Sequence, residues 1–315
     1  MGRFTGCIRP EKDNPLQILV IGEILWDIFD HAEYLGGAPL NFSAAIQRLG
    51  NSVALITGLG DDSYGRRALQ SMTELGLSTK FVQVWPEAAT GTARVTTDNA
   101  GNARFFIQRP AAFDEVRLSE VDLAAIEALH PEWVYFGTLT QTHPPALATL
   151  DSLLHRLPSA KRFYDMNLRE GHWNLPLVQR LSQDASILKL NDSEAEILFQ
   201  LSCPSDTFSL EKFASYWSSK YNIETICITL GSKGCAVYRQ NALHRFDGFA
   251  VKVADTVGAG DAFAAAFLHG QIQGWDEARQ AAFANALGAL VASRSGATPA
   301  WTAEECLQMI SERVL

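Results

Sequence analysis

The sequence has no cluster of basic residues, and its 26 Lys and Arg are outnumbered by 35 Asp and Glu, which gives a formal net charge of −9. A nucleic-acid-binding surface needs grouped Lys and Arg to neutralise phosphates, so we expect no nucleic-acid partner. No apolar run reaches the roughly 18 residues of a membrane span, so we expect no membrane partner either. The five cysteines are scattered without a CxxC pair, which is not the pattern of a disulfide framework.

Several familiar catalytic motifs are missing as well. Neither the P-loop G-x-x-x-x-G-K-[ST] nor the zinc motif H-E-x-x-H occurs, and GLGDDSYG does not have the G-x-G-x-x-G spacing of a dinucleotide fingerprint. The first 15 residues, MGRFTGCIRPEKDNP, lack the apolar core of a signal peptide. We therefore expect a loose tail over 1–16 and one domain over 17–315, in a cytoplasmic protein with reduced cysteines.

Apolar strand-like runs alternate with helical stretches along most of the chain. A continuous apolar run over 17–25 is typical of a parallel strand buried on both faces. It is followed by helix, strand and helix up to residue 76. From residue 132 onward we expect strands at 132–137, 161–167, 185–191, 224–231, 234–240 and 242–248, and helices at 144–157, 192–200, 259–271, 276–294 and 303–315. This order predicts an α/β fold with a doubly wound, mostly parallel sheet flanked by helices.

The segment between these two parts has a different pattern. Residues 81–85, 90–98 and 103–108 alternate apolar and polar side chains, with a turn at 98–101. Such alternation is typical of antiparallel strands with one face in water. We expect a small antiparallel β lid, formed mainly by about residues 80–108 with part of 25–36.

The stretch DTVGAGDAF, Asp255–Phe263, places small residues and a carboxylate at the start of an apolar helix. The first backbone N–H groups of such a helix have no intrahelical partner, and small residues let an anion approach them. The helix dipole also favours negative charge there. Gly258, Ala259 and Gly260 therefore predict a phosphate or oxyanion cradle. Asp261 is either a favourable first-turn acid or a base that takes a proton from an attacking hydroxyl.

This stretch resembles the C-terminal signature of the PfkB/ribokinase family of carbohydrate kinases. The segment GGAPLNFSAAIQRLG, Gly36–Gly50, resembles the N-terminal signature of the same family. The two stand in the family's order, so the resemblance extends from Ile18 to about Ala300 and implies a ribokinase-like fold. It also implies that Asp261 is the catalytic base and that the three residues before it form the anion hole.

The resemblance implies a sugar site built from the first signature and from the ends of two strands. The paired glycines would let a sugar lie against the backbone while Asn41 binds a hydroxyl, although a turn and a helix cap explain the same residues. Ligands of open α/β sheets bind at the carboxyl ends of strands. The alternative for Asp27 is an acid in a solvated loop. The alternative for the DMNLR stretch is a strand end with an arginine in a salt bridge. The expected substrate-binding residues are Asp27, Gly36, Gly37, Asn41, Arg109, Asp165, Asn167 and Arg169.

The resemblance also implies ATP and metal ions. The stretch NDSE resembles the family's N-x-x-E motif, which organises Mg²⁺ through water, although a helix cap explains it equally. TLGSKG would lie along the nucleotide phosphates, or simply form a hairpin turn. The implied ATP residues are Asn191, Thr229, Gly231, Gly234 and Asn285, and Glu194 is the implied Mg²⁺ residue. The implied site for a monovalent cation such as K⁺ comprises Asp255, Val257, Val291, Arg294 and Gly296.

The substrate is expected to be a small sugar. GEILWDIF, GGAPLNF and YDMNLREGHW are most similar to stretches of bacterial fructokinases, which favours D-fructose. A 2-keto-3-deoxygluconate kinase is the alternative, because Arg109 or Arg169 would hold a sugar carboxylate bidentately; another sugar kinase of the family also remains open. A non-catalytic sensor of nucleotide or sugar is the alternative of a different class. We further expect a homodimer formed through the β lid.

Overall fold

The computed structural model describes residues 16–97 and 103–313. Its main sheet has nine strands, which are in spatial order β13 (Ala242–Phe246), β12 (Cys235–Arg239), β11 (Thr225–Thr229), β10 (Ile187–Asn191), β9 (Lys161–Asp165), β8 (Trp133–Gly137), β1 (Ile18–Ile21), β4 (Val53–Gly60) and β5 (Val82–Trp85). The pairings that involve β12 and β13 are antiparallel, and all the others are parallel. The expected mostly parallel sheet is therefore confirmed.

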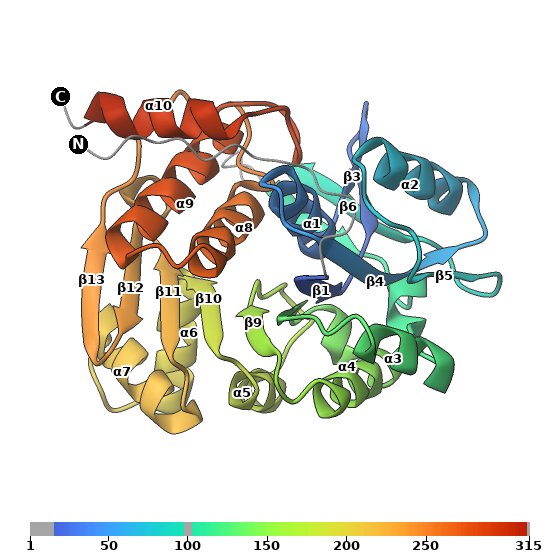
Figure 1. The fold of residues 1–315 in the computed structure, drawn as a ribbon, viewed down its shortest axis with the longest axis horizontal. Helices are drawn as coiled ribbons and strands as arrows, with labels where there is room; N and C mark the ends of the chain where they lie inside the picture. The colour runs from blue at the N-terminus through green and yellow to red at the C-terminus, as the bar shows by residue number, and fades with distance from the viewer. Residues whose placement is uncertain (1–15, 98–102, 314–315) are drawn as a thin grey trace.

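Helices cover both faces of this sheet (Figure 1). One layer contains α1 (Ala38–Arg48), α2 (Ser63–Glu74), α8 (Ala259–Ile272), α9 (Glu277–Ala292) and α10 (Ala303–Arg313). The other contains α3 (Glu120–Glu127), α4 (Pro144–Arg156), α5 (Leu175–Gln183), α6 (Asp192–Ser202) and α7 (Leu210–Tyr221). Alternation along β1 explains both cores, because Ile18 and Val20 pack into the first while Leu19 and Ile21 pack into the second. None of the described helices is long and apolar enough to cross a membrane.

A second, smaller sheet stands beside the main one. Its strands lie in the order β3 (Glu33–Gly36), β2 (Leu25–Ile28), β6 (Gly91–Thr97) and β7 (Ala103–Ile107). Its two outer pairings are antiparallel, and the central pairing of β2 with β6 is parallel. The turn predicted at 98–101 lies outside the described residues.

Three predicted element bounds need correction. The apolar run over 17–25 is divided, because β1 ends at Ile21 and the chain from Leu25 onward forms β2 in the small sheet. The segment at 81–85 belongs to the main sheet, where β5 pairs with β4. Leu16, which falls within the predicted tail, is buried in the second core. The pattern of apolar residues indicates which positions are buried, but it does not indicate which sheet a strand joins.

Candidate active site

A cavity of about 300 Å³ opens at the carboxyl ends of the main-sheet strands, beside the start of α8. It is lined by Gly37 and Asn41 of the first signature motif, by Gly258 and Asp261 of the second, and by Asp27 of β2. Ligands of open α/β sheets bind at this end of the strands. The fold therefore brings together the two motifs that the sequence separates.

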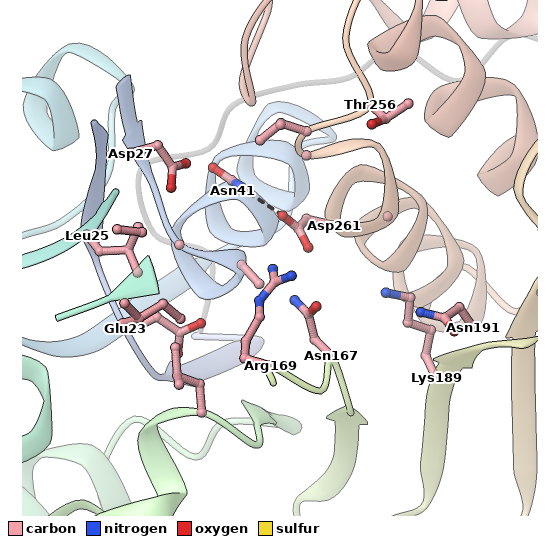
Figure 2. A pocket seen from close by; sticks show the side chains of 18 of the residues that line it. Glu23, Leu25, Asp27, Asn41, Asn167, Arg169, Lys189, Asn191, Thr256 and Asp261 are labelled. Atoms are coloured by element: carbon pink, nitrogen blue, oxygen red, sulfur yellow. Dashed lines mark hydrogen bonds between the residues drawn. The ribbon is translucent and has the colours of Figure 1, made fainter. Parts of the chain in front are cut away.

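Asn41 and Asp261 meet inside this first cavity. Asn41 Nδ2 donates a 2.8 Å hydrogen bond to Asp261 Oδ2, drawn as the dashed line in Figure 2. Both side chains are buried. Asn41 Oδ1 is also buried and has no hydrogen-bond partner among the described residues. A buried acceptor that lacks a partner at the wall of a polar cavity is suited to accept a hydrogen bond from a ligand hydroxyl.

Gly258 begins the helix that carries Asp261. It caps α8 with φ of 78°, a left-handed conformation. A Cβ added at Gly258 would lie 2.2 Å from the carbonyl oxygen of Ala297, so glycine alone fits here. The first-turn N–H groups of α8 lack intrahelical partners, although Ala259 N–H makes a 3.3 Å hydrogen bond to the carbonyl of Thr256. These N–H groups are the ones to which the sequence analysis assigns the anion hole.

The buried carboxyl groups of the cavity have raised pKa values. Burial, and after it the neighbouring charge of Asp165, raise the pKa of Asp261 from 3.8 to about 6, although Lys189, Asn41 and Arg169 act to lower it. Burial also raises the pKa of Asp27 to about 6, although Arg169 lowers it. An Asp261 carboxyl with this pKa is ionised near neutral pH and is a stronger base than an ordinary aspartate.

The other residues of the first motif lie against the same wall. Gly37 has φ of 109°, and an added Cβ would lie 2.5 Å from the carbonyl oxygen of Glu23, so α1 begins in close contact with the chain that leaves β1. A Cβ on Gly36 would lie 2.8 Å from Asp27 Oδ2. Gly36 therefore leaves room for the Asp27 carboxylate, and Gly37 leaves room for the main chain at Glu23.

Two residues of the DMNLR stretch reach the cavity. Asn167 and Arg169 line it, and Figure 2 draws Arg169 between Glu23 and Asn167, below Asp261. Asp165, the first residue of this stretch, is buried and does not line the cavity. Its Oδ1 accepts a 2.9 Å hydrogen bond from Lys189 Nζ, and its Oδ2 accepts one of 2.9 Å from a tyrosine hydroxyl. Both oxygens have protein partners and Asp165 does not line the cavity, so the structure does not bring it to the predicted sugar site.

Arg109, also predicted to bind substrate, is not brought to the predicted sugar site either. It lines neither the first cavity nor the one described below. Its guanidinium pairs bidentately with Asp114 and donates to the carbonyl of Leu139 and the hydroxyl of Thr142. These bonds fix the loop after β7, which is a structural role.

Asn191 and Glu194 form a capping box at the start of α6. The N–H of each residue donates a 2.8 Å hydrogen bond to the side chain of the other, and Leu168 N–H donates to the second oxygen of Glu194 at 2.7 Å. Both residues line the first cavity. Within the described ranges, no group of three or more His, Cys, Asp or Glu could hold a metal ion. Mg²⁺ is commonly held through water and phosphate oxygens, and an ion at Glu194 would be held in this way.

A second cavity of about 510 Å³ adjoins the first. It is lined by four of the residues predicted to bind ATP, namely Thr229, Gly231, Gly234 and Asn285. Asn285 Nδ2 donates to the carbonyls of Phe246 and Asp247, at 3.2 and 3.3 Å, so its amide braces the wall of the cavity. Thr229, Thr256 and Gly260 line both cavities, which therefore meet at the start of α8.

The two segments predicted to hold a monovalent cation are tied together by Asp255. Its carboxylate accepts hydrogen bonds from Val257 N–H at 3.0 Å and from Gly296 N–H at 3.1 Å. Val291 is buried, and its carbonyl accepts a 3.0 Å hydrogen bond from Arg294 N–H. The Arg294 guanidinium pairs with Glu305. These segments would offer a cation mainly backbone carbonyls.

Sequence reasoning missed two charged residues of the first cavity, Glu23 and Lys189. Glu23 Oε2 accepts a 2.7 Å hydrogen bond from the Thr140 hydroxyl, and burial raises the pKa of Glu23. Both residues carried a signal in the sequence. Glu23 follows a strand almost directly, and Lys189 interrupts the apolar strand ILKL.

Known proteins resemble this chain over most of its length. Residues 22–304 match the pfkB family of carbohydrate kinases. Probable fructokinase-3 from Arabidopsis thaliana is 30% identical over 280 residues, which cover 84% of this chain and 79% of that protein. Fructokinase-2 from Solanum lycopersicum is 30% identical over 291 residues, which cover 87% and 86% of the two chains.

The fold has solved relatives too. A crystal structure of fructokinase with bound ATP from Xylella fastidiosa is similar with a TM-score of 0.85 at 24% identity, over 96% of this chain and 100% of that one. This similarity confirms the ribokinase-like fold predicted from the sequence. The chain belongs to the pfkB family of carbohydrate kinases, and it is a phosphotransferase whose acceptor is a sugar hydroxyl.

Proposed function

We propose that this protein transfers the γ-phosphoryl group of ATP to a hydroxyl of D-fructose. The observation that carries the proposal is the hydrogen bond between Asn41 and Asp261, which leaves Asn41 Oδ1 without a partner beside a buried carboxylate. A sugar hydroxyl between these groups would donate to one of them and lie within reach of the base. Relatives named fructokinase, and the bound ATP of the Xylella structure, support the choice of substrates.

The reaction needs positioning and charge stabilisation more than covalent chemistry. Asp261 takes the proton from the sugar hydroxyl, whose oxygen forms a bond to the γ-phosphorus while the bond from that phosphorus to the bridging oxygen of ADP breaks. The N–H groups at the start of α8 stabilise the negative charge of the group in transfer. Mg²⁺ near Asn191 and Glu194 would neutralise phosphate charge, and K⁺ bound at the Asp255 segments would reinforce the start of α8.

The composition of the first cavity favours a neutral sugar over a sugar acid. Glu23, Asp27 and Asp261 all line it and are all buried, and buried carboxylates accept hydrogen bonds from hydroxyl groups well. A substrate carboxylate beside these three acids would be repelled by them, although one held next to Arg169 or Lys189 would be attracted. Arg109 cannot offset that repulsion because it is engaged with Asp114.

The small sheet contributes Leu25, Ala93 and Ile107 to the wall of the first cavity. These residues lie on β2, β6 and β7, so a movement of this sheet would open or close the sugar cavity. We propose that it acts as a lid that excludes water from the γ-phosphate. A working lid implies that hydrolysis of ATP in the absence of sugar is slow.

Measuring ADP formation tests the substrate assignment. MgATP would be supplied with D-fructose, D-ribose, 2-keto-3-deoxygluconate or no sugar, each in K⁺ or in tetramethylammonium, with EDTA as the blank. We expect the highest kcat/KM with D-fructose, at least about tenfold above the sugar acid, because a misplaced charge costs several kcal/mol. We also expect higher rates in K⁺ and little ADP without sugar.

Other outcomes of this assay would redirect the proposal. Preference for the sugar acid would move specificity to Arg169, whereas rapid ATP loss without sugar would refute the lid. Binding of ATP and sugar with no ADP formed from any of the sugars would favour the sensor.

The raised pKa values predict the pH dependence of the reaction. We expect kcat/KM to fall as the pH decreases through about 6, the pKa of both Asp27 and Asp261. Below that pH, the Asp261 carboxyl holds its proton and cannot accept one from the sugar, so the loss begins higher than for an ordinary aspartate. A pH–rate profile that is flat down to about pH 5 would contradict this assignment.

A further inference from the structure

Lys189 is a buried cation that the proposed mechanism does not use. It lies on β10 among Ile187, Leu188 and Leu190, and its side chain is 9% exposed. Burial lowers the pKa of Lys189, but the carboxylates of Asp165 and Asp261 outweigh this effect and leave the pKa raised. The ammonium group is therefore charged at neutral pH. Buried charges are costly, so a lysine kept at this place requires a physical reason.

Lys189 is held by a chain of buried hydrogen bonds. Its Nζ donates to Asp165 Oδ1 at 2.9 Å, and Asp165 Oδ2 accepts from the Tyr135 hydroxyl at 2.9 Å. The Tyr135 ring stacks on Phe42 of α1 with a centroid distance of 3.9 Å. Each member of the chain is therefore fixed by the next, and Lys189 has little freedom to turn away. An ammonium group has three donors, and Asp165 uses one of them.

The remaining donors lie beside the anion hole. Lys189 lines the first cavity, and a Cβ added at Gly260 would lie 3.4 Å from its Nζ. Gly260 is one of the residues that line both cavities, so this amine stands where sugar and nucleotide would meet. Figure 2 shows Lys189 next to Asn191, while Arg169, the other cation of the first cavity, lies nearer Glu23. The two cations therefore serve different ends of the cavity.

We propose that Lys189 provides a fixed positive charge at the anion hole of α8, where it stabilises the phosphoryl group during transfer, and that Asp165 positions it. This inference rests on the proposed phosphoryl transfer. Three negatively charged oxygens surround the phosphorus in transfer, and preorganised cations at such a group lower the barrier. Lys189 lines the cavity and Asp165 does not, so the ammonium is the charge of this pair that faces the phosphoryl group.

A purely structural ion pair is the competing explanation, and a double variant separates the two. Lys189→Met alone leaves Asp165 buried and unpaired, which is strongly destabilising. Lys189→Met combined with Asp165→Asn removes both charges, keeps similar volumes and retains an acceptor for Tyr135. If the pair only held the fold together, this neutral double variant would remain active.

The experiment measures kcat and KM for the wild type, the single variant and the double variant. Lys161→Met is the matched control, because Lys161 is an exposed lysine at the opposite end of the neighbouring strand β9. We expect kcat of the double variant to fall roughly 10²–10³-fold, with KM for the sugar within about threefold of the wild type. The control should keep its kcat. A double variant with kcat within about threefold of the wild type would overturn the inference.

Binding measurements distinguish a failure of this inference from a failure of the proposed function. Calorimetry would compare ADP alone with ADP, aluminium fluoride and D-fructose, which together resemble the transferring group. We expect the double variant to lose affinity for the aluminium fluoride complex by about 10²-fold and to bind ADP normally. If the wild type phosphorylated none of the sugars, the proposed function would fail. Equal affinities of the wild type and the double variant for aluminium fluoride with ADP would separately refute the proposed role of Lys189.

Discussion

Asp261→Asn is expected to reduce kcat by roughly 10²–10⁴-fold while the affinity for ATP remains unchanged. The asparagine amide cannot accept the sugar proton, but it keeps the size of the side chain and an oxygen that can accept from Asn41 Nδ2. Steady-state kinetics with saturating D-fructose would measure the loss, and calorimetric titration with ADP would show that the nucleotide cavity is intact. A reduction of less than tenfold would rule out Asp261 as the base.

The same variant should be more stable than the wild type at pH 8. A loss of activity in a more stable protein would then come from the missing base and not from unfolding. The pKa of Asp261 is raised from 3.8 to about 6, so its ionised form disfavours the folded state. That penalty is fully present above pH 6 and disappears as the pH falls below 3.8, where both states are protonated. At about 1.4 kcal/mol per pKa unit it amounts to roughly 3 kcal/mol, which an uncharged asparagine avoids.

Asp184→Asn is the matched control for this substitution. Asp184 is another aspartate whose pKa is raised mainly by burial, and it caps the end of α5, away from both cavities. We expect its variant to gain stability in the same direction and to retain full kcat. Equal losses of activity in both variants would show that the effect at 261 is not specific to the base.

The sequence predicts the main architecture because its determinants are local. Apolar strands and amphipathic helices alternate, and a parallel sheet covered on both faces follows from that order. The assignment of short strands to sheets is not local. Residues 81–85 and 103–108 have similar alternation, yet β5 pairs with β4 while β7 pairs with β6. What decides between them is contact with distant segments, which no single stretch encodes.

The same distinction divides the site. The start of α8 can be predicted from the sequence because a short motif forms it, with the glycine cap and the first-turn acid close together in the chain. Hydrogen-bond partners that lie on different strands cannot be predicted in this way. Asp165 resembles a cavity residue in sequence, but Lys189 lies 24 residues later and reaches back to pair with it. Arg109 likewise resembles a substrate-binding residue in sequence, but the structure pairs it with Asp114.

Gly258→Ala is expected to reduce kcat by roughly 10²-fold or more although it changes no ionisable group. The added Cβ would lie 2.2 Å from the carbonyl oxygen of Ala297 and 2.8 Å from its carbonyl carbon, so backbone must move. The alanine would also be strained at φ of 78°, which costs about 1–2 kcal/mol. Movement of the helix start displaces the N–H groups from the transferring phosphoryl group. Steady-state kinetics and thermal unfolding of the purified variant would measure both effects.

Gly274→Ala separates displacement of the anion hole from loss of stability. Gly274 lies just beyond the other end of α8, has φ of 65°, and an added Cβ there would meet nothing within 4 Å. The two alanines therefore impose a similar backbone strain, but only the one at 258 collides with another segment. We expect Gly274→Ala to lose about 1–2 kcal/mol of stability and to keep its kcat. If both variants lost stability and neither lost activity, the chemistry would not depend on where α8 begins, and the anion hole would have to lie elsewhere.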